Sequence, residues 1–168
     1  MTDASGTAAS SSAEALAALE AAARVLAKAR SVLVIDWPSR DVPATLAVAG
    51  FAVTVKSGPG PTDYTAWEIA GGEPVTRPLG RAPDHADLVY CHRPFAELPS
   101  IIALAQGLGA TAVWRQTGLT STGAKAPGGC WAPPEETQRG HELAAAAGLN
   151  YIDDIYIADA VRGLASPA

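Results

Sequence analysis

One short apolar run constrains the fold of this chain more than any other feature. Residues 31–36 read Ser-Val-Leu-Val-Ile-Asp, and the four central positions are all aliphatic. A strand with one face in solvent alternates apolar and polar residues, whereas a strand covered on both faces has no such alternation. The run therefore predicts a parallel β-sheet that lies between two layers of helices.

Strands and helices are expected to alternate along the rest of the chain. Apolar runs predict further strands at 51–56, 87–91, 111–115 and 150–153. Apolar residues at helical spacing, often followed by a glycine, predict helices at 42–49, 95–108, 134–147 and 155–163. This alternation is typical of an α/β domain with a doubly wound, mainly parallel sheet of about five strands.

Two regions lie outside this alternation. Residues 1–12 are small and polar, and we expect a disordered tail there, followed by an additional amino-terminal helix over 13–29. The glycine- and proline-rich stretch 58–83 contains two segments, 64–69 and 74–79, that can pair as a small hairpin. We therefore expect an extra helix and a hairpin insert around the parallel sheet.

Composition excludes several classes of protein. The chain has 168 residues, and we expect residues 13–168 to form a single domain. Its 12 basic and 17 acidic side chains give a formal charge of −5, which disfavours binding to nucleic acid or to an anionic membrane surface. Two cysteines, Cys91 and Cys130, are too few for a disulfide framework or a cysteine-built zinc site. The amino terminus lacks the pattern of a signal peptide, and we expect a cytoplasmic protein.

Charged residues gather where the first strands are expected to end. In a doubly wound sheet, ligands bind beyond the carboxyl ends of the strands. Arg40 and Arg93 follow two of these ends, and a guanidinium group suits a phosphate or a carboxylate. Asp36 places a negative charge near the position where phosphate normally lies. The competing interpretation is that Arg40 pairs with Asp36 or Asp41, and that Ser39 or Asp41 caps the next helix.

The later strand ends carry further polar side chains. Cys91 and His92 point in alternate directions along their strand, so they do not form a Cys–His nucleophile pair. We interpret Cys91 as a small core residue and His92 as a polar side chain at the strand end. Gln116 and Thr117 supply an amide and a hydroxyl to the same edge of the sheet, with a purely structural turn as the alternative.

Two adjacent carboxylates, Asp153 and Asp154, follow the last expected strand. At the start of a helix they are suitable capping residues. Together with Asp36 they also form a candidate magnesium site, because carboxylate oxygens are ligands that hard cations prefer. The sequence contains no nucleophile–base pair beside them, so we assign no catalytic residue and no metal ligand.

Two stretches in the second half carry a family resemblance. They read Asp-Leu-Val-Tyr-Cys-His-Arg-Pro at 87–94 and Thr-Ala-Val-Trp-Arg-Gln-Thr-Gly at 111–118. An Arg-Pro pair after one strand, combined with Trp-x-Gln-x-Gly at the end of the next, resembles the CoA-binding domain family. This small Rossmann-like domain is also found in the α subunit of succinyl-CoA synthetase. The resemblance extends more weakly to residues 32–56.

The resemblance implies that the carboxyl edge of the sheet binds the adenine nucleotide of coenzyme A. Carried over by position, the cofactor-binding residues are Trp37, Ser39, Arg40, Lys56, Arg93, Pro94, Gln116 and Gly118. The family has Gly-x-Ser after the first strand, where this chain has Asp-Trp-Pro at 36–38. The amino-terminal helix and the stretch 58–83 have no counterpart in the family.

These observations support three hypotheses about function. The first is a non-catalytic module that binds CoA, acyl-CoA or an adenine nucleotide. The second is a structural or regulatory protein that keeps the fold without a ligand and acts as a homo-oligomer or with another protein. It predicts an apolar surface patch at Trp37 and Trp67. The third is a nucleotide- or magnesium-dependent enzyme that uses Asp36, Asp153 and Asp154.

Overall fold

A computed structural model of the chain describes residues 5–36, 40–117 and 132–165. Its strands form one seven-stranded sheet in the order β4-β3-β2-β1-β5-β6-β7. Five neighbouring strands pair in parallel: β1 (Ser31–Ile35), β2 (Ala52–Lys56), β5 (Leu88–Cys91), β6 (Ala112–Arg115) and β7 (Asn150–Asp153). The antiparallel hairpin of β3 (Tyr64–Ala70) and β4 (Glu73–Pro78) extends the sheet beyond β2. The expected parallel sheet and hairpin insert are both confirmed.

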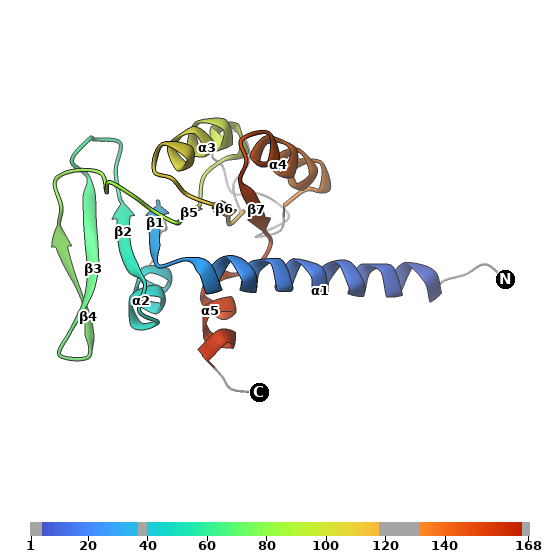
Figure 1. Cartoon of the computed structure of the whole chain (residues 1–168), viewed down its shortest axis with the longest axis horizontal. Helices are drawn as coiled ribbons and strands as arrows, with labels where there is room; N and C mark the ends of the chain where they lie inside the picture. The colour runs from blue at the N-terminus through green and yellow to red at the C-terminus, as the bar shows by residue number, and fades with distance from the viewer. Residues whose placement is uncertain (1–4, 37–39, 118–131, 166–168) are drawn as a thin grey trace.

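The helices cover both faces of the sheet (Figure 1). One face packs against α1 (Ser5–Lys28), α2 (Asp41–Val48) and α5 (Ile157–Ala165). The other face packs against α3 (Leu98–Gly107), which follows the short 3₁₀ helix η1 (Phe95–Glu97), and against α4 (Pro134–Ala146). None of the helices in the described ranges is both long and apolar enough to span a membrane.

The central strand β1 shows why its sequence is continuously apolar. Val32 and Val34 belong to the core on the α2 and α5 side, whereas Leu33 and Ile35 belong to the core on the α3 and α4 side. All four side chains are buried. Successive residues of a strand point to opposite faces, so a strand between two helical layers needs an apolar residue at every position.

The strand order places a switch point beside β1. From β1 the chain crosses to β2 on one side, and it later returns to β5 on the other side of β1. The loops that leave β1 and β5 therefore lead to helices on opposite faces of the sheet. Between such loops a doubly wound sheet has a crevice at its carboxyl edge.

Helix boundaries differ from the expected ones in two places. The first helix begins at Ser5 rather than at residue 13, so the expected tail is helical over 5–12, and residues 1–4 lie outside the described part. Ten of the 24 residues of α1 are alanine, which has the highest helix propensity. The expected helix over 95–108 is divided into η1 and α3, because Pro99 lies in the first turn of α3, where its missing N–H is not needed.

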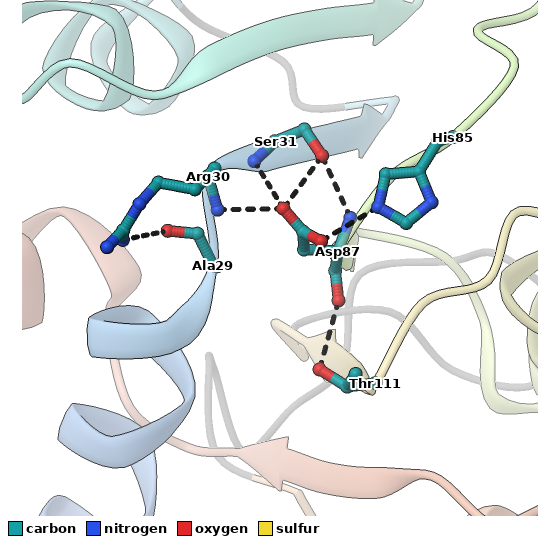
Figure 2. A network of polar contacts seen from close by, with 6 residues as sticks. All are labelled: Ala29, Arg30, Ser31, His85, Asp87 and Thr111. Carbon is teal, nitrogen blue, oxygen red and sulfur yellow. Dashed lines mark hydrogen bonds and ion pairs between the residues drawn. The ribbon is translucent and has the colours of Figure 1, made fainter.

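A network around Asp87 joins the opposite, amino-terminal edge of the sheet (Figure 2). Asp87 Oδ2 accepts hydrogen bonds from the backbone N–H groups of Arg30 at 2.8 Å and Ser31 at 2.9 Å, and Oδ1 lies 2.8 Å from His85 Nε2. The Thr111 hydroxyl donates to the Asp87 carbonyl oxygen. The bond to His85 and the backbone bonds hold the pKa of Asp87 well below its usual range. Through its carboxylate and its carbonyl oxygen, Asp87 thus connects the starts of β1, β5 and β6.

A first prediction concerns the packing of α4 on β7. A Cβ atom at Gly140 would lie 2.5 Å from ring carbons of the buried Tyr151. We expect Gly140→Ala to lower the free energy of unfolding by about 1–3 kcal/mol, measured by urea denaturation. The control is Gly163→Ala in α5, where a Cβ meets nothing within 4 Å and helix propensity predicts a gain of up to about 1 kcal/mol. Equal changes in the free energy of unfolding for Gly140→Ala and Gly163→Ala would contradict this packing of α4 on β7.

A second prediction concerns Asp87. We expect Asp87→Asn to lower the free energy of unfolding at pH 7 by about 1–3 kcal/mol, because the backbone N–H groups of Arg30 and Ser31 lose a charged acceptor. The pKa of Asp87 is lower in the folded state than in the unfolded chain, so its contribution is complete above about pH 4 and declines as the pH falls further. The difference in the free energy of unfolding between wild type and Asp87→Asn should therefore become smaller in acid. Glu73→Gln, at an exposed position in the hairpin, is the control and should leave stability unchanged at both pH values.

Candidate functional site

A pocket of about 490 Å³ lies at the switch point of the sheet. Its lining comes from the ends of β1 and β2, the turn after β2, and the segment after β5: Ile35, Asp36, Lys56, Ser57, Gly58, Pro59, Arg93 and Glu97. The volume is in the range of small-molecule sites. Lys56 and Arg93, two residues predicted from the sequence to bind a cofactor, thus line the same pocket, which we call the switch-point pocket.

Arg93 lies between two carboxylates in this pocket. Its Nε and Nη2 donate to the two oxygens of Glu97, at 2.8 and 2.6 Å, and its Nη1 donates to Asp36 Oδ2. Glu97 is four residues further along the chain, at the end of η1. Hydrogen bonds to Glu97 and Asp36 raise the pKa of Arg93 above its usual value, and the bond from Arg93 lowers the pKa of Glu97. Arg93 is a permanent cation in this site.

Asp36 has an unusual backbone conformation for a residue with a side chain. It directly follows β1 with a φ of 55°, in the left-handed region that glycine occupies without strain. Its backbone N–H donates to the Lys56 carbonyl oxygen at 3.1 Å, which connects the ends of β1 and β2. The chain therefore keeps a glycine-like turn at this position and adds a carboxylate to it.

The hairpin insert contributes one wall of the pocket. Lys56 Nζ donates to the Gly60 carbonyl oxygen at 3.3 Å and lies 4.8 Å from the centre of the Tyr64 ring. The Asp63 carboxylate accepts from the Gly60 N–H at 2.7 Å. A Cβ at Gly58 would lie 2.5 Å from Asp63 Oδ2, so a side chain there would displace this carboxylate. Sequence reasoning identified Lys56 but missed the adjoining turn.

Arg40 and Trp67 lie together, away from the lining of the pocket. The Arg40 guanidinium carbon lies 4.5 Å from the centre of the Trp67 ring, a cation–π arrangement. Trp67 is only 8% exposed and belongs to the core on the α2 side. The prediction of an exposed Trp67 is therefore wrong, because this side chain of β3 is directed into the core. Asp36 pairs with Arg93 rather than with Arg40.

The other predicted residues divide into buried and undescribed ones. Pro94 is buried before η1, and Gln116 is buried directly after β6, so neither lines the switch-point pocket. The carbonyl oxygen of Gln116 lies 3.3 Å from Nδ1 of the half-buried His92, whose pKa is lowered by burial. Cys91 is fully buried, which raises its pKa to about 12 and confirms its interpretation as a core residue. Four residues singled out above lie outside the described residues: Trp37, Ser39, Gly118 and Cys130.

The three carboxylates of the proposed magnesium site are not brought together. Asp36 follows β1 and the other two belong to the end of β7, with β5 and β6 between these strands. Three strand spacings amount to about 14 Å, too far for one ion. Asp153 accepts a hydrogen bond from Thr137, and Asp154 from the backbone of Ala132, so both support the start of α4. Within the described ranges no cluster of three potential metal ligands exists, and this magnesium-site hypothesis is wrong.

Arg115, a buried arginine that sequence reasoning missed, holds the backbone of the segment that carries Arg93. Arg115 is 1% exposed, and its Nη1 donates to Glu136 Oε2 at 2.9 Å. Its Nε donates at 3.2 Å to the carbonyl oxygen of Arg93, and its guanidinium carbon lies 5.3 Å from the centre of the Phe95 ring. Arg115 thus positions the backbone that carries Arg93. Its partner Glu136 is 21 residues away, a distance at which no local pattern identifies the pair.

Strand order, helix layers and the pocket between β1 and β5 define a Rossmann-like α/β fold with a pocket at its switch point. A model of the family described as CoA binding domain matches residues 36–157, and the chain belongs to this family. The fold is similar to that in the crystal structure of Prb, described as PH1109 protein redesigned for binding. The TM-score is 0.54 at 16% identity, over 89% of this chain and 94% of Prb. No curated protein matches the chain.

A third prediction tests the ion pair between the buried Arg115 and Glu136. We expect Glu136→Gln to lower the free energy of unfolding by about 3–5 kcal/mol, because Arg115 is left as a buried charge without its carboxylate. The matched control is Glu135→Gln at the exposed neighbouring position, which should change stability by less than about 0.5 kcal/mol. Combining Glu136→Gln with Arg115→Met should recover part of the loss. A loss as large in the double variant would show that the pair is not responsible.

Proposed function

We propose that this chain is a non-catalytic module that binds coenzyme A, acyl-CoA or a related adenine nucleotide at the switch-point pocket. The observation that carries the proposal is the meeting of Lys56 and Arg93 at the carboxyl ends of β2 and β5, in a member of the CoA binding domain family. Two cations at this edge suit the diphosphate of such a ligand.

The remaining candidate residues take supporting positions in this proposal. Arg40, Pro94 and Gln116 lie at the same edge of the sheet without lining the pocket. Trp37, Ser39 and Gly118 are assigned by the family resemblance alone. A pocket of about 490 Å³ encloses only a portion of a molecule as large as CoA, so we expect the rest of the ligand to lie over the neighbouring loops. We assign residues 13–168 to this one domain.

The chemistry of the pocket supports binding without catalysis. Its described lining contains neither histidine nor cysteine. The thiol of Cys91, at the end of β5, is buried with a pKa of about 12, so it stays protonated at neutral pH and is a poor nucleophile. Arg93 is a permanent cation and cannot act as a general base. These groups hold and neutralise an anion rather than transfer a proton.

The alternative function is that of a structural or regulatory protein that binds no ligand and contacts a protein partner. It now depends on a different surface from the one predicted at Trp37 and Trp67. Leu16 and Leu19 of α1 are 58% and 53% exposed, and the amino-terminal part of this helix projects from the body of the molecule (Figure 1). Exposed leucines on a projecting helix favour contact with a second copy or another protein. Light scattering tests this candidate, since a strictly monomeric chain without a ligand would leave it unsupported.

A fourth prediction tests ligand binding in the switch-point pocket. In calorimetric titrations taken to millimolar CoA, we expect Lys56→Ala and Arg93→Ala to bind CoA about tenfold or more weakly than wild type, as expected for the loss of a charge-assisted hydrogen bond. Arg93→Ala should have the larger effect, because it also leaves Asp36 and Glu97 without their partner. The control is Arg81→Ala, at an exposed arginine paired with Asp84 before β5. The absence of both heat and thermal stabilisation with CoA, acyl-CoA and adenine nucleotides would overturn the proposal.

A further inference from the structure

Arg93, the main candidate for binding an anion, is already engaged by the chain itself. An arginine side chain has five N–H groups, and three hydrogen bonds from Arg93 go to carboxylates, two to Glu97 and one to Asp36. An incoming phosphate needs the same guanidinium. The carboxylates of Glu97 and Asp36 therefore already occupy the guanidinium that an anionic ligand would bind.

The charges that line the switch-point pocket cancel. Lys56 and Arg93 contribute two positive charges, and Asp36 and Glu97 contribute two negative charges. A pocket that holds a diphosphate by electrostatics normally has an excess of positive charge. In this chain a phosphate that approaches Arg93 also approaches two carboxylates, and like charges at contact distance repel.

The two carboxylates differ in how firmly they hold Arg93. Glu97 forms two hydrogen bonds, at 2.8 and 2.6 Å, from a position four residues further along the chain. Asp36 forms one hydrogen bond, from a strand end 57 residues earlier in the chain. The Asp36 side chain is 50% exposed, so rotation about its own side-chain bonds is enough to move the carboxylate into solvent. Asp36 is the partner that a ligand displaces.

We propose that Asp36 is a built-in competitor for the anionic group of the ligand. In the unliganded pocket its carboxylate occupies Arg93, and the phosphate of the ligand takes its place on binding. This inference rests on the proposed function, and it adds a residue that lowers the affinity for phosphate-bearing ligands. The glycine-like φ of 55° at Asp36 is consistent with it, since the turn itself needs no side chain there.

A residue that competes for Arg93 and a residue that only positions Arg93 have opposite effects on the affinity for the ligand. A carboxylate that only orients Arg93 would strengthen binding, and its removal would weaken the complex. A competitor has the opposite sign, because its removal frees a donor and takes away a repulsive charge. The sign of the change in affinity therefore separates the two roles, and a ligand without phosphate should be indifferent to the substitution.

The test is a calorimetric titration of the full chain with CoA, inorganic pyrophosphate and pantetheine, the portion of CoA that lacks phosphate. We expect Asp36→Asn and Asp36→Gly to bind CoA and pyrophosphate about tenfold or more tightly than wild type, with no change for pantetheine. Asparagine tolerates the left-handed conformation and glycine adopts it freely, so the pair separates the charge from the backbone. Thermal unfolding of each variant verifies that it is folded.

A matched control removes a carboxylate elsewhere. Asp84 pairs with the exposed Arg81 before β5, outside the pocket lining. Asp84→Asn changes the net charge of the chain by the same amount and should leave all three affinities at the wild-type values. An equal rise in this variant would assign the effect to overall charge, and would overturn the inference.

The remaining outcomes separate the inference from the proposed function. If neither wild type nor any variant binds CoA, but both Asp36 variants bind pyrophosphate more tightly than wild type does, the CoA proposal fails and the competition at Arg93 stands. If wild type binds CoA and the Asp36 variants bind it equally or more weakly, CoA binding stands and the competitor role is overturned. If neither variant binds CoA or pyrophosphate more tightly than wild type, the inference fails whatever wild type does.

Discussion

The burial of β1 on both faces is the constraint on which the rest of the structure depends. A strand with aliphatic side chains on both sides requires helices over both faces of the sheet. The chain meets this requirement by placing β2 on one side of β1 and β5 on the other. The same arrangement separates the loops after β1 and β5 and opens the switch-point pocket between them. The location of the site thus follows from the packing of a single strand.

Features with a local physical cause could be predicted from the sequence. The strands, most of the helices and the hairpin follow from apolar periodicity and from glycine and proline, and the structure contains them within a few residues of the expected bounds. Lys56 and Arg93 were identified because residues at the ends of parallel strands meet at one edge of the sheet. The local pattern was sufficient to locate the edge that carries the candidate site.

Features that depend on contacts between distant segments could not be predicted. The burial of Trp67 depends on the side of the sheet to which β3 directs it, and a hairpin of uncertain register leaves that side open. The pairing of Arg115 with Glu136, and that of Arg93 with Asp36, joins residues whose spacing has no helical or strand period. Sequence reasoning named Asp36 but associated it with Asp153 and Asp154. Strand order decides its real partner, because β5 is adjacent to β1 and β7 is not.

The two edges of the sheet carry carboxylates in different surroundings, Asp87 at one edge and Asp36 at the other. Asp87 accepts hydrogen bonds from two backbone N–H groups at the start of β1. Asp36 accepts from an arginine side chain that also faces a pocket. The first carboxylate is part of the framework because its donors are backbone groups that β1 holds in place. The second is exchangeable under the proposal made above, because a phosphate would offer Arg93 an equivalent acceptor.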